Sequence, residues 1–444
     1  MLRITLVAVL VCISARSQEL PEPAVTLAHV KLKMAEALAQ TTNYTCLATM
    51  ERASRSSPER PFTRADTVRF EIANVAGREL FAWEGEGRFE DQSIGAALPY
   101  GVVSNGEYTL HARAVFTDGY ATIRFVGRET LNGLDALRWN YVIPLFGSGW
   151  TISNRGRRVR TGAHGAFWVD PKTLDVMRLD MHADDLPPDF VNTAAATWVD
   201  YGRVQLGSRD VLLPQTAGLI LDEKSGKRKL KQNLNLLVFS HCRQYSAESS
   251  VSFDEKAIPS LPARATTKDV ELPAGLVLRL RLAAPIDSST TAVGDRVNAI
   301  TTTDVHHGSR IVVPSGVTAH GRVRRIERRE GPPVQYALGL EFSELEWNGQ
   351  RIRFFGDLER LEPAIKGLRE IAGVGPVEYR SAPDSDAQIY NIPDIPGNAT
   401  LLIEGAAFRI PAGTTMTWRS GKVKWSRPRL RSPNWAPGPS PSGR

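Results

Sequence analysis

The spacing of apolar residues changes along this chain from a helical period to a strand period. In the segment AVTLAHVKLKMAEALAQ, residues 24–40, apolar side chains recur every three or four positions. Ala and Lys occupy many of the remaining positions, and both residues favour a helix over a strand. The segment is therefore predicted to form a helix. Its apolar face carries Leu27, Val30, Met34 and Leu38.

Short runs rich in β-branched and aromatic residues follow this helix, and Gly, Asn, Asp or Pro separate them. This spacing is typical of a large antiparallel sheet. Apolar and polar residues alternate over 67–72, so one face of the sheet is predicted to be covered by the helix and the other to be wet. The predicted covered residues are Val68, Phe70 and Ile72, and the predicted wet residues are Thr67, Arg69 and Glu71.

Breaks in this pattern divide the chain, whose predicted fold class is mainly β. Residues 22–253 are predicted to form an α+β first domain, a curved open antiparallel sheet around the N-terminal helix. Residues 254–269 are rich in Pro, Ala and Thr and are predicted to be a linker. Residues 270–420 are predicted to form a second β-rich domain, a small barrel or sandwich with a helix over 359–372. Residues 421–444 are predicted to be a disordered basic tail rich in Pro and Ser.

An apolar residue followed by Pro-(Ala/Ser)-Gly occurs three times in the second domain, at residues 272–275, 313–316 and 410–413. Pro fixes φ at about −65° and suits the second position of a turn, and Gly tolerates left-handed geometry at the end of the turn. Each copy is predicted to start a strand in a fixed register, and the motif carries no chemistry of its own.

The first 17 residues are predicted to be a signal peptide. An Arg precedes a mostly apolar run over 4–13, and the small residues of 15–17 suit cleavage. The apolar run is too short to span a bilayer, because a spanning helix needs roughly 20 residues. A lipid-modified Cys12 is disfavoured because Val11 stands where a lipoprotein signal has Gly, Ala or Ser.

Cleavage of this signal leaves two cysteines, Cys46 and Cys242, which lie in strand-like runs. An even pair in an oxidising compartment indicates a disulfide, and the alternative is two separately buried thiols. The disulfide is the prediction.

The net charge of +7 is unevenly distributed. Six Lys and Arg residues and no acid lie in 421–444, so the rest of the chain is close to neutral. Nucleic acid is not an expected partner, because proteins that bind it more often carry their basic residues on the folded surface. For the tail, a solvated disordered segment is favoured over contact with an anionic membrane surface.

The stretch AFWVDPKTLDVMRLDMHA, residues 166–183, resembles the Trp-Ile-Asp-Pro-x-Thr hairpin of outer-membrane lipoprotein-sorting proteins, the LolA/LppX-like group. The matching residues are Trp168, Val169, Asp170, Pro171, Lys172, Thr173, Val176, Arg178 and Asp180. The resemblance covers residues 24–253 and implies a curved, unclosed sheet around helices, whose apolar concavity holds acyl chains. It implies lipid or lipoprotein acyl chains as partners.

Residues 272–325 resemble the β module of TrbI-like channel components of conjugation and type IV secretion machines. The similar segments are Pro273-Ala274-Gly275, Ile286-Asp287-Ser288, Val293-Gly294-Asp295, Asp304-Val305 and Ile311–Gly316, followed by Gly321. The family carries a membrane helix and a long Pro-rich spacer ahead of this module, and neither is found here. The resemblance therefore implies a β-barrel module without a secretion-channel role.

No catalytic motif stands out, since Gly-x-Ser-x-Gly, phosphate-loop and dinucleotide fingerprints are all missing from the sequence. Asp184, Asp185 and Asp189 are interpreted as a solvated turn, because two prolines between them break the pattern of a calcium loop. The histidines form no His-x-His or His-x-x-x-His pair, so no metal ligand and no cofactor is predicted. They are His29, His111, His164, His182, His241, His306, His307 and His320.

Two groups of side chains leave alternatives open. Six aromatic residues of the first domain are predicted to be sheet core, and the alternative is the lining of an apolar ligand cavity. Five arginines are predicted to form a solvated strand edge, and the alternative is contact with anionic lipid headgroups. The aromatic residues are Trp83, Trp139, Tyr141, Trp150, Trp168 and Trp198, and the arginines are Arg322, Arg324, Arg325, Arg328 and Arg329.

Together these features predict an exported, non-enzymatic protein of the periplasm or cell envelope of a Gram-negative bacterium. The leading hypothesis is that the first domain binds or carries an apolar, lipid-like ligand, through residues that the sequence does not single out. The alternatives are an envelope scaffold or interaction protein without a small-molecule ligand, and an unrecognised hydrolase.

Overall fold

The structure is a computed structural model. The residues it describes are 22–41, 44–75, 78–86, 89, 94–98, 101–154, 157–225, 229–244, 270–329, 331–363, 365–372 and 398–421. The predicted signal peptide over 1–17, the predicted linker over 254–269 and residues 422–444 of the predicted tail lie outside the described residues.

Contacts within the chain define two compact units, and each is described by itself. Unit 1 comprises Met1–Tyr44, Asn74–Glu79 and Gly106–Leu221, and unit 2 comprises Thr45–Ala73, Leu80–Asn105 and Asp222–Arg444. The helices are α1 Pro23–Thr41, α2 Ile94–Ala97 and α3 Leu110–Phe116. Helix α1 confirms the helix predicted over 24–40, whereas the domain limits at 253 and 270 stay predictions.

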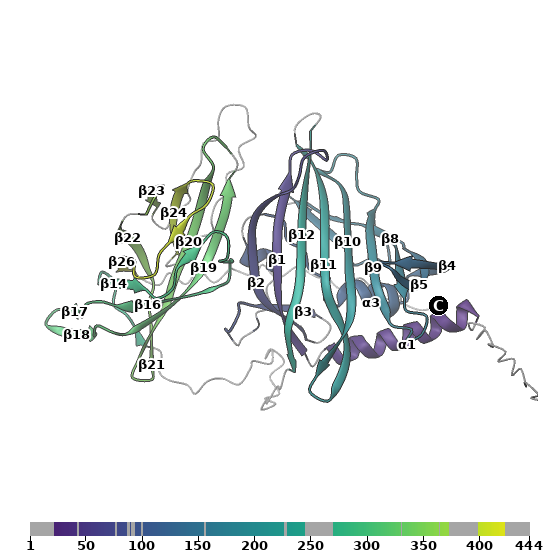
Figure 1. Cartoon of the computed structure of the whole chain (residues 1–444), viewed down its shortest axis with the longest axis horizontal. Helices are drawn as coiled ribbons and strands as arrows, with labels where there is room; N and C mark the ends of the chain where they lie inside the picture. Colours follow the sequence, from purple (N-terminus) through teal and green to yellow (C-terminus); the bar gives the residue numbers. More distant parts are fainter. Residues whose placement is uncertain are drawn as a thin grey trace, which may run out of the picture. The chain divides into compact units, whose positions relative to one another are not determined.

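The first of two large sheets has ten strands. They are β1 Tyr44–Arg55, β2 Thr63–Val75, β3 Arg78–Ala82, β4 Thr122–Leu131, β5 Leu134–Ile143, β8 Gly162–Val169, β9 Val176–Asp184, β10 Asn192–Leu206, β11 Arg209–Ser225 and β12 Lys229–Gln244. Their order is β3-β2-β1-β12-β11-β10-β9-β8-β5-β4, and neighbours such as β8 and β9 run antiparallel (Figure 1). A separate hairpin pairs β6 Thr151–Asn154 with β7 Arg157–Arg160. The predicted large antiparallel sheet is confirmed.

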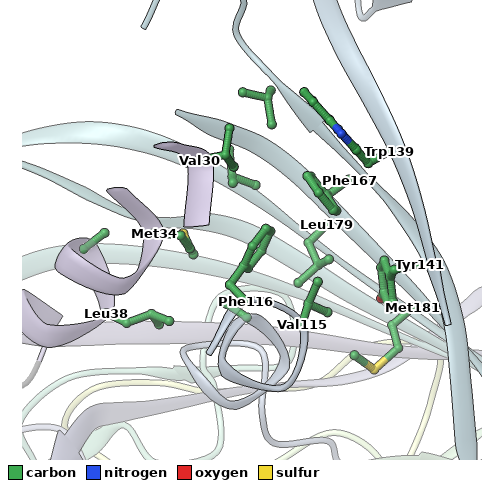
Figure 2. Packing of buried hydrophobic residues seen from close by; sticks show 14 of the residues in the cluster. Val30, Met34, Leu38, Val115, Phe116, Trp139, Tyr141, Phe167, Leu179 and Met181 are labelled. Carbon is green, nitrogen blue, oxygen red and sulfur yellow. The ribbon is translucent and has the colours of Figure 1, made fainter. Parts of the chain in front are cut away.

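The core of unit 1 lies on the face of this sheet that α1 and α3 cover, called the inner face below. Val30, Met34 and Leu38 of α1 point toward it, as do Val115 and Phe116 of α3 (Figure 2). The three residues of α1 recur every four positions, which places them on one stripe of the helix. The helical period in the sequence therefore identified the correct buried face.

The opposite face of β2, in unit 2, is covered, so the wet face predicted over 67–72 is wrong. Thr67 is 7% exposed and Glu71 is 3% exposed. The Arg69 N–H donates to the Val293 carbonyl at 2.8 Å, and the Val293 N–H donates to the Thr67 carbonyl at 2.8 Å. Arg69 Nη1 also lies 2.7 Å from both carboxylate oxygens of Asp295. A segment far away in the sequence therefore shields side chains that a local pattern assigns to solvent.

The second large sheet lies in unit 2 and curls into a half-barrel (Figure 1). Its strands are β13 Val270–Glu271, β14 Val277–Leu282, β16 Arg296–Thr301, β19 Thr318–Arg329, β20 Gln335–Trp347, β21 Gln350–Arg353, β22 Gly356–Glu362, β23 Leu368–Ala372, β24 Asn398–Glu404 and β26 Thr415–Ser420. The order is β13-β21-β20-β19-β16-β14-β26-β22, and β24 pairs with β20 and β23. Two short pairs join β15 Ile286–Asp287 to β25 Arg409–Ile410 and β17 Val305–His307 to β18 Arg310–Val313.

The three Pro-x-Gly segments are turns that precede β14, β19 and β26, as predicted. The φ angles of Gly275, Gly316 and Gly413 are 89°, 84° and 84°, in the left-handed region that favours glycine. Each glycine N–H donates to a carbonyl on an adjacent strand, which fixes where the following strand begins. The acceptors are Ser420 at 2.7 Å, Thr301 at 2.8 Å and Leu282 at 2.8 Å.

The helix predicted over 359–372 is wrong, because β22 and β23 occupy most of this segment. Strand β22 pairs with β26, and β23 pairs with β24. Pro363 lies inside the predicted helix, where its ring and missing N–H disfavour a continuous helix. Pairing with distant strands outweighs the modest helix propensity of the remaining residues.

The prediction that five arginines form a solvated strand edge is also wrong. The five arginines lie on β19, an interior strand between β16 and β20. Arg325 is 3% exposed and pairs with Glu327, and Arg322 is 9% exposed. The Arg324 guanidinium lies over the Trp83 ring, 5.0 Å from its centroid. These three cations are therefore enclosed by the protein and are not presented to lipid headgroups.

Candidate functional site

The inner face of unit 1 is an apolar surface built from three adjacent strands. Strand β5 contributes Trp139 and Tyr141, β8 contributes Phe167, and β9 contributes Leu179 and Met181 (Figure 2). Each of these side chains is at most 2% exposed, and the strand period of two places them on one face. The Trp139 and Phe167 rings are stacked, with centroids 5.5 Å apart. The surface combines aromatic rings with aliphatic side chains, as apolar binding sites do.

Helix α3 packs directly on this surface. The Phe116 and Phe167 ring centroids are 4.9 Å apart, and Ala112 and Val115 are at most 1% exposed. In this structure, therefore, side chains of the chain itself lie over the inner face, where the LolA-like resemblance predicts an apolar concavity.

A buried carboxylate anchors α3. Glu79 on β3 accepts hydrogen bonds from the N–H groups of Gly106 at 2.7 Å, Thr109 at 2.7 Å and Leu110 at 3.2 Å. Thr109 is the N-cap residue of α3 and its side chain makes no capping bond, so Glu79 satisfies N–H groups that the helix leaves open. Burial raises the pKa of Glu79, and the hydrogen bonds from these N–H groups only partly counter it.

His111 of α3 is buried close to this anchor. Its ring meets the Trp150 ring edge-on, with centroids 5.8 Å apart. Burial lowers the pKa of His111 to about 4, so the imidazole is neutral at physiological pH. Within the described part of the chain no hydrogen bond joins His111 to Glu79, so the arrangement positions a helix and does not form an acid–base pair.

Helix α1 is held to the sheet by an ionic network. Lys33 Nζ lies 2.8 Å from Asp175 Oδ1, and Lys33 also donates to the Thr173 carbonyl. Arg203 of β10 donates to the same carboxylate from Nε at 2.7 Å and from Nη2 at 2.8 Å. Burial opposes ionisation of Asp175, but hydrogen bonds from Arg203 and Lys33 outweigh it and lower the pKa of this carboxyl to about 2.

This network is attached to the predicted Asp-Pro hairpin. Asp170 Oδ1 accepts hydrogen bonds from the N–H groups of Lys172 at 2.7 Å and Thr173 at 2.9 Å, which closes the turn between β8 and β9. The turn predicted from the sequence is confirmed. Its position explains why the hairpin matters here: Asp175, directly before β9, holds α1.

An exposed apolar turn follows β5. The turn runs from Pro144 to Gly147, whose N–H donates to the Pro144 carbonyl at 2.9 Å. Its central residues, Leu145 and Phe146, are 44% and 76% exposed, at positions where small polar residues or glycine are usual. The Tyr120 ring, also half exposed, meets the Phe146 ring edge-on with centroids 6.2 Å apart.

Neighbouring residues hold this apolar turn in place. From here on, the name covers Leu145 and Phe146 together with Tyr120, whose ring packs on Phe146. Arg160 Nη2 donates to the Phe146 carbonyl at 3.0 Å. A Cβ at Gly147 would lie 2.5 Å from Tyr120 Cβ, so glycine is required for the close approach of the two residues. This turn was not among the sites predicted from the sequence, although the letters PLFG already show large apolar residues at a Pro-to-Gly turn.

Part of the predicted aromatic set lies away from the inner face. Trp139 and Tyr141 belong to the group of buried apolar residues on the inner face, called the inner-face cluster, and Trp150 packs at its margin. Trp168 and Trp198 lie on the opposite face of the sheet, and Trp83 belongs to unit 2. Guanidinium groups cover both outer rings of unit 1, Arg138 over Trp168 at 5.3 Å and Arg178 over Trp198 at 5.7 Å. The sheet-core interpretation therefore holds for Trp139 and Tyr141 on the inner face, and also for Trp168, which is 8% exposed in a second buried cluster with Ala136 and Ala166.

The described residues contain no group of three or more His, Cys, Asp and Glu side chains that could hold a metal ion. In the predicted solvated turn, Asp189 is an exposed partner of Arg157 at 2.8 Å, and Asp184 lies 2.7 Å from His164 Nδ1. Over the same described segments, every helix is too short or too polar to cross a membrane.

Cys46 and Cys242 form the predicted disulfide, with an S–S distance of 2.05 Å. The bond joins β1 to β12, which are neighbours in the first sheet, and the Cys46 side chain is fully buried. The alternative of two separate buried thiols is thereby excluded. Such bonds form and persist in oxidising compartments.

The sequence matches no family model and no curated protein. In structure the chain is similar to a DUF1329 family protein from Desulfovibrio piger, with 10% identity and a TM-score of 0.27, over 52% of this chain and 96% of that chain. It is also similar to a domain assigned to outer membrane lipoprotein sorting from Vibrio parahaemolyticus, with 12% identity and a TM-score of 0.27, over 50% of this chain and 94% of that chain. The TrbI-like resemblance of residues 272–325 stays a prediction.

Proposed function

We propose that unit 1 binds an apolar, lipid-like ligand on its inner face, and that the chain is an exported envelope carrier without catalytic activity. The observation that supports this proposal is the continuity between the buried inner face and the exposed apolar turn. Ile143, at the end of β5, belongs to the inner-face cluster and is 1% exposed, whereas Phe146, three residues later, is 76% exposed. Exposed apolar patches of this kind mark surfaces that meet an apolar partner.

The residues between the turn and the cluster continue the same apolar surface. Ala121, Ile123 and Phe125 follow Tyr120 in the chain, and they are partly buried against the inner-face cluster. The Phe125 and Trp139 ring centroids are 5.0 Å apart. An acyl chain that first meets the apolar turn therefore finds a path of apolar side chains along β4 toward the aromatic rings.

Ligand binding requires α3 and α1 to move away from the sheet, because their side chains lie on the inner face. Separation of Phe116 from Phe167 exposes apolar surface, and this costs free energy. Burial of an acyl chain contributes about 0.8 kcal/mol for each methylene, so a chain of about ten carbons contributes about 8 kcal/mol. A long acyl chain is therefore sufficient to offset the displacement of a few side chains.

The disulfide supports the proposed location. Its formation requires an oxidising compartment such as the periplasm, and the signal peptide predicted over 1–17 provides the route of export. The proposed setting is the Gram-negative cell envelope, with lipid or lipoprotein acyl chains as the partners.

Mass spectrometry of an organic extract of the purified mature protein tests the proposal directly. We expect a lipid in near-equimolar amount, and uptake of a fluorescent fatty acid by protein from which the lipid has been extracted. The double variant L145S/F146S is expected to slow this uptake. Leu134→Ser is the matched control, because Leu134 is 60% exposed at the other end of β5. Protein that is repeatedly recovered empty and that takes up no fatty acid contradicts the proposal.

The packing of the inner face favours one alternative, an envelope scaffold without a ligand. Trp139, Phe167 and Phe116 form a continuous aromatic cluster that needs no ligand to be buried. A scaffold is expected to keep the same unfolding midpoint before and after lipid extraction, whereas a carrier loses the stabilisation that its ligand provides.

A further inference from the structure

Two histidines face each other across β8 and β9 in unit 1. His164 and His182 are directly opposite in the register of the two strands. Their chain neighbours Ala163 and Met181 belong to the inner-face cluster, so the strand period of two places both imidazoles on the outer face of the sheet. The rings are stacked, with centroids 5.2 Å apart and planes inclined by 14°. Both side chains are exposed to solvent.

Asp184 determines which nitrogen of His164 is available to a ligand. His164 Nδ1 lies 2.7 Å from Asp184 Oδ1. An ionised carboxylate only accepts hydrogen bonds, so Nδ1 of the neutral imidazole carries the proton and Nε2 presents its lone pair. A carboxylate that orients a histidine in this way is the usual second partner of a metal-bound imidazole.

The surroundings of the pair leave the two rings accessible. Val142 lies opposite His164 on β5, and Ala196 lies opposite His182 on β10, so the flanking side chains are small and apolar. Arg178, on the same face of β9, is paired with two carboxylates at 2.8 and 3.2 Å, which neutralise its charge. Within the described part of the chain, His182 makes no hydrogen bond that holds its ring in place.

We propose that His164 and His182 together bind one divalent transition-metal ion. Imidazole nitrogens suit Cu²⁺, Ni²⁺ and Zn²⁺, and such metal–nitrogen bonds are about 2.1 Å long. The two donor nitrogens then stand at most about 4 Å apart, so the exposed rings tilt toward each other at their outer edges. His164 binds through Nε2, His182 binds through a ring nitrogen, and water completes the coordination.

Asp184 is a positioning residue of this site, because it acts on the metal through His164. Two protein ligands give a readily exchangeable site, unlike the closed centres that hold a structural zinc ion with four ligands. Among the divalent ions, Cu²⁺ is expected to bind more tightly than Ni²⁺ or Zn²⁺.

Calorimetric titration of the metal-free mature protein with Cu²⁺, and separately with Zn²⁺, tests this site. We expect one ion for each chain, a loss of affinity of at least tenfold in His164→Gln and in His182→Gln, and a smaller loss in Asp184→Asn. His306→Gln is the matched control, because His306 is an exposed histidine on another strand pair and its loss leaves the affinity unchanged.

Thermal unfolding provides a second measurement, the rise of the unfolding midpoint on addition of Cu²⁺. Histidines with a purely structural role would not cause this rise. Because both rings are exposed, the variants are expected to unfold at the wild-type midpoint without metal, and Cu²⁺ raises this midpoint most in the wild type, less in Asp184→Asn and not in H164Q/H182Q. If H164Q/H182Q binds Cu²⁺ as tightly as the wild type, or if the wild type binds neither ion at millimolar concentration, the proposal is overturned. Neither result bears on lipid binding, which concerns the other face of the sheet.

Discussion

Lys33 of α1 and Asp175 of the β8–β9 hairpin form an ion pair, with Nζ 2.8 Å from Oδ1, that holds the covering helix on the sheet of unit 1. The Asp175 side chain is 10% exposed, and Arg203 shares its carboxylate. One buried anion therefore compensates two cations from different elements. Helix α1 contributes Val30, Met34 and Leu38 to the core, so the network helps to keep the inner face covered.

Replacement of Asp175 is expected to weaken unit 1. Asp175→Asn keeps the size of the side chain but removes the anion that pairs with Lys33 and leaves Arg203 with Asp210, 3.3 Å from its Nη1. We expect the free energy of unfolding to fall by about 2 kcal/mol. Denaturant unfolding measures this change. Asp189→Asn is the control, since Asp189 pairs with Arg157 in solvent at 74% exposure and such pairs contribute little. Equal losses in the two variants would contradict the importance of the Asp175 network.

The pKa of Asp175 also predicts a dependence of stability on pH. Its pKa is lowered from 3.8 to about 2 in the folded state, so its contribution is complete above about pH 4 and is lost as the pH falls toward 2. We expect the wild type to lose about 2 kcal/mol over this interval that Asp175→Asn does not lose. Parallel stability curves for the two proteins between pH 5 and pH 2 would show that another group is responsible.

Glu79 is expected to make the stability depend on pH in the direction opposite to that of Asp175. Burial raises the pKa of Glu79 above its ordinary 4.5, so the folded state favours the protonated form and loses stability as the pH rises from about 4.5 through the raised pKa. Glu79→Gln removes this dependence. Glu79→Ala leaves the N–H groups of α3 without an acceptor at every pH, and we expect a loss of about 3 kcal/mol. Unfolding of both variants followed from pH 4 to pH 8 checks these outcomes, and a wild-type slope that persists in Glu79→Gln excludes Glu79.

The features predicted correctly from the sequence depend on residues that are close together in the chain. The stripe of Val30, Met34 and Leu38 needs only the helical period, and the turns at Gly275 and Gly316 need only Pro and Gly at the right spacing. The two cysteines left after signal cleavage allow a single intramolecular pairing, so the disulfide also needed no knowledge of the fold.

The errors arise where a distant segment covers a local pattern. Val293 pairs with β2, and Trp83 packs under Arg324. No pattern among residues close together in the chain predicts either contact. The histidine pair is different, because the predicted hairpin could have revealed it. Trp168 lies opposite Arg178, and four residues further along each strand are His164 and His182. The register that starts at the turn therefore places the two histidines opposite each other.

Loss of the disulfide is expected to destabilise unit 2. The bond joins residues separated by 196 positions, and removal of a bond that closes such a loop costs about 2–5 kcal/mol. The variant Cys46→Ala/Cys242→Ala is therefore expected to unfold at lower denaturant concentration than the wild type. Reductant serves as the control, since it should lower the wild-type midpoint and leave that of the variant unchanged. A wild type that is insensitive to reductant, with both thiols shown to be reduced, contradicts this prediction.

The repeated Pro-x-Gly turns allow backbone strain to be separated from packing. Gly316 has a φ of 84°, and no heavy atom lies within 4 Å of a Cβ built there, so Gly316→Ala imposes only the cost of a left-handed backbone, about 1–2 kcal/mol. Gly331→Ala is the matched control in the same unit, because its φ is not in the left-handed region and its closest contact is an ordinary 3.7 Å. Denaturant unfolding is expected to show a loss for the first variant and none for the second, since Ala restricts the unfolded chain at a compatible position. Similar values for both variants would mean that the left-handed turn does not select glycine, and that the register of β19 depends on its pairing with β16 and β20 alone.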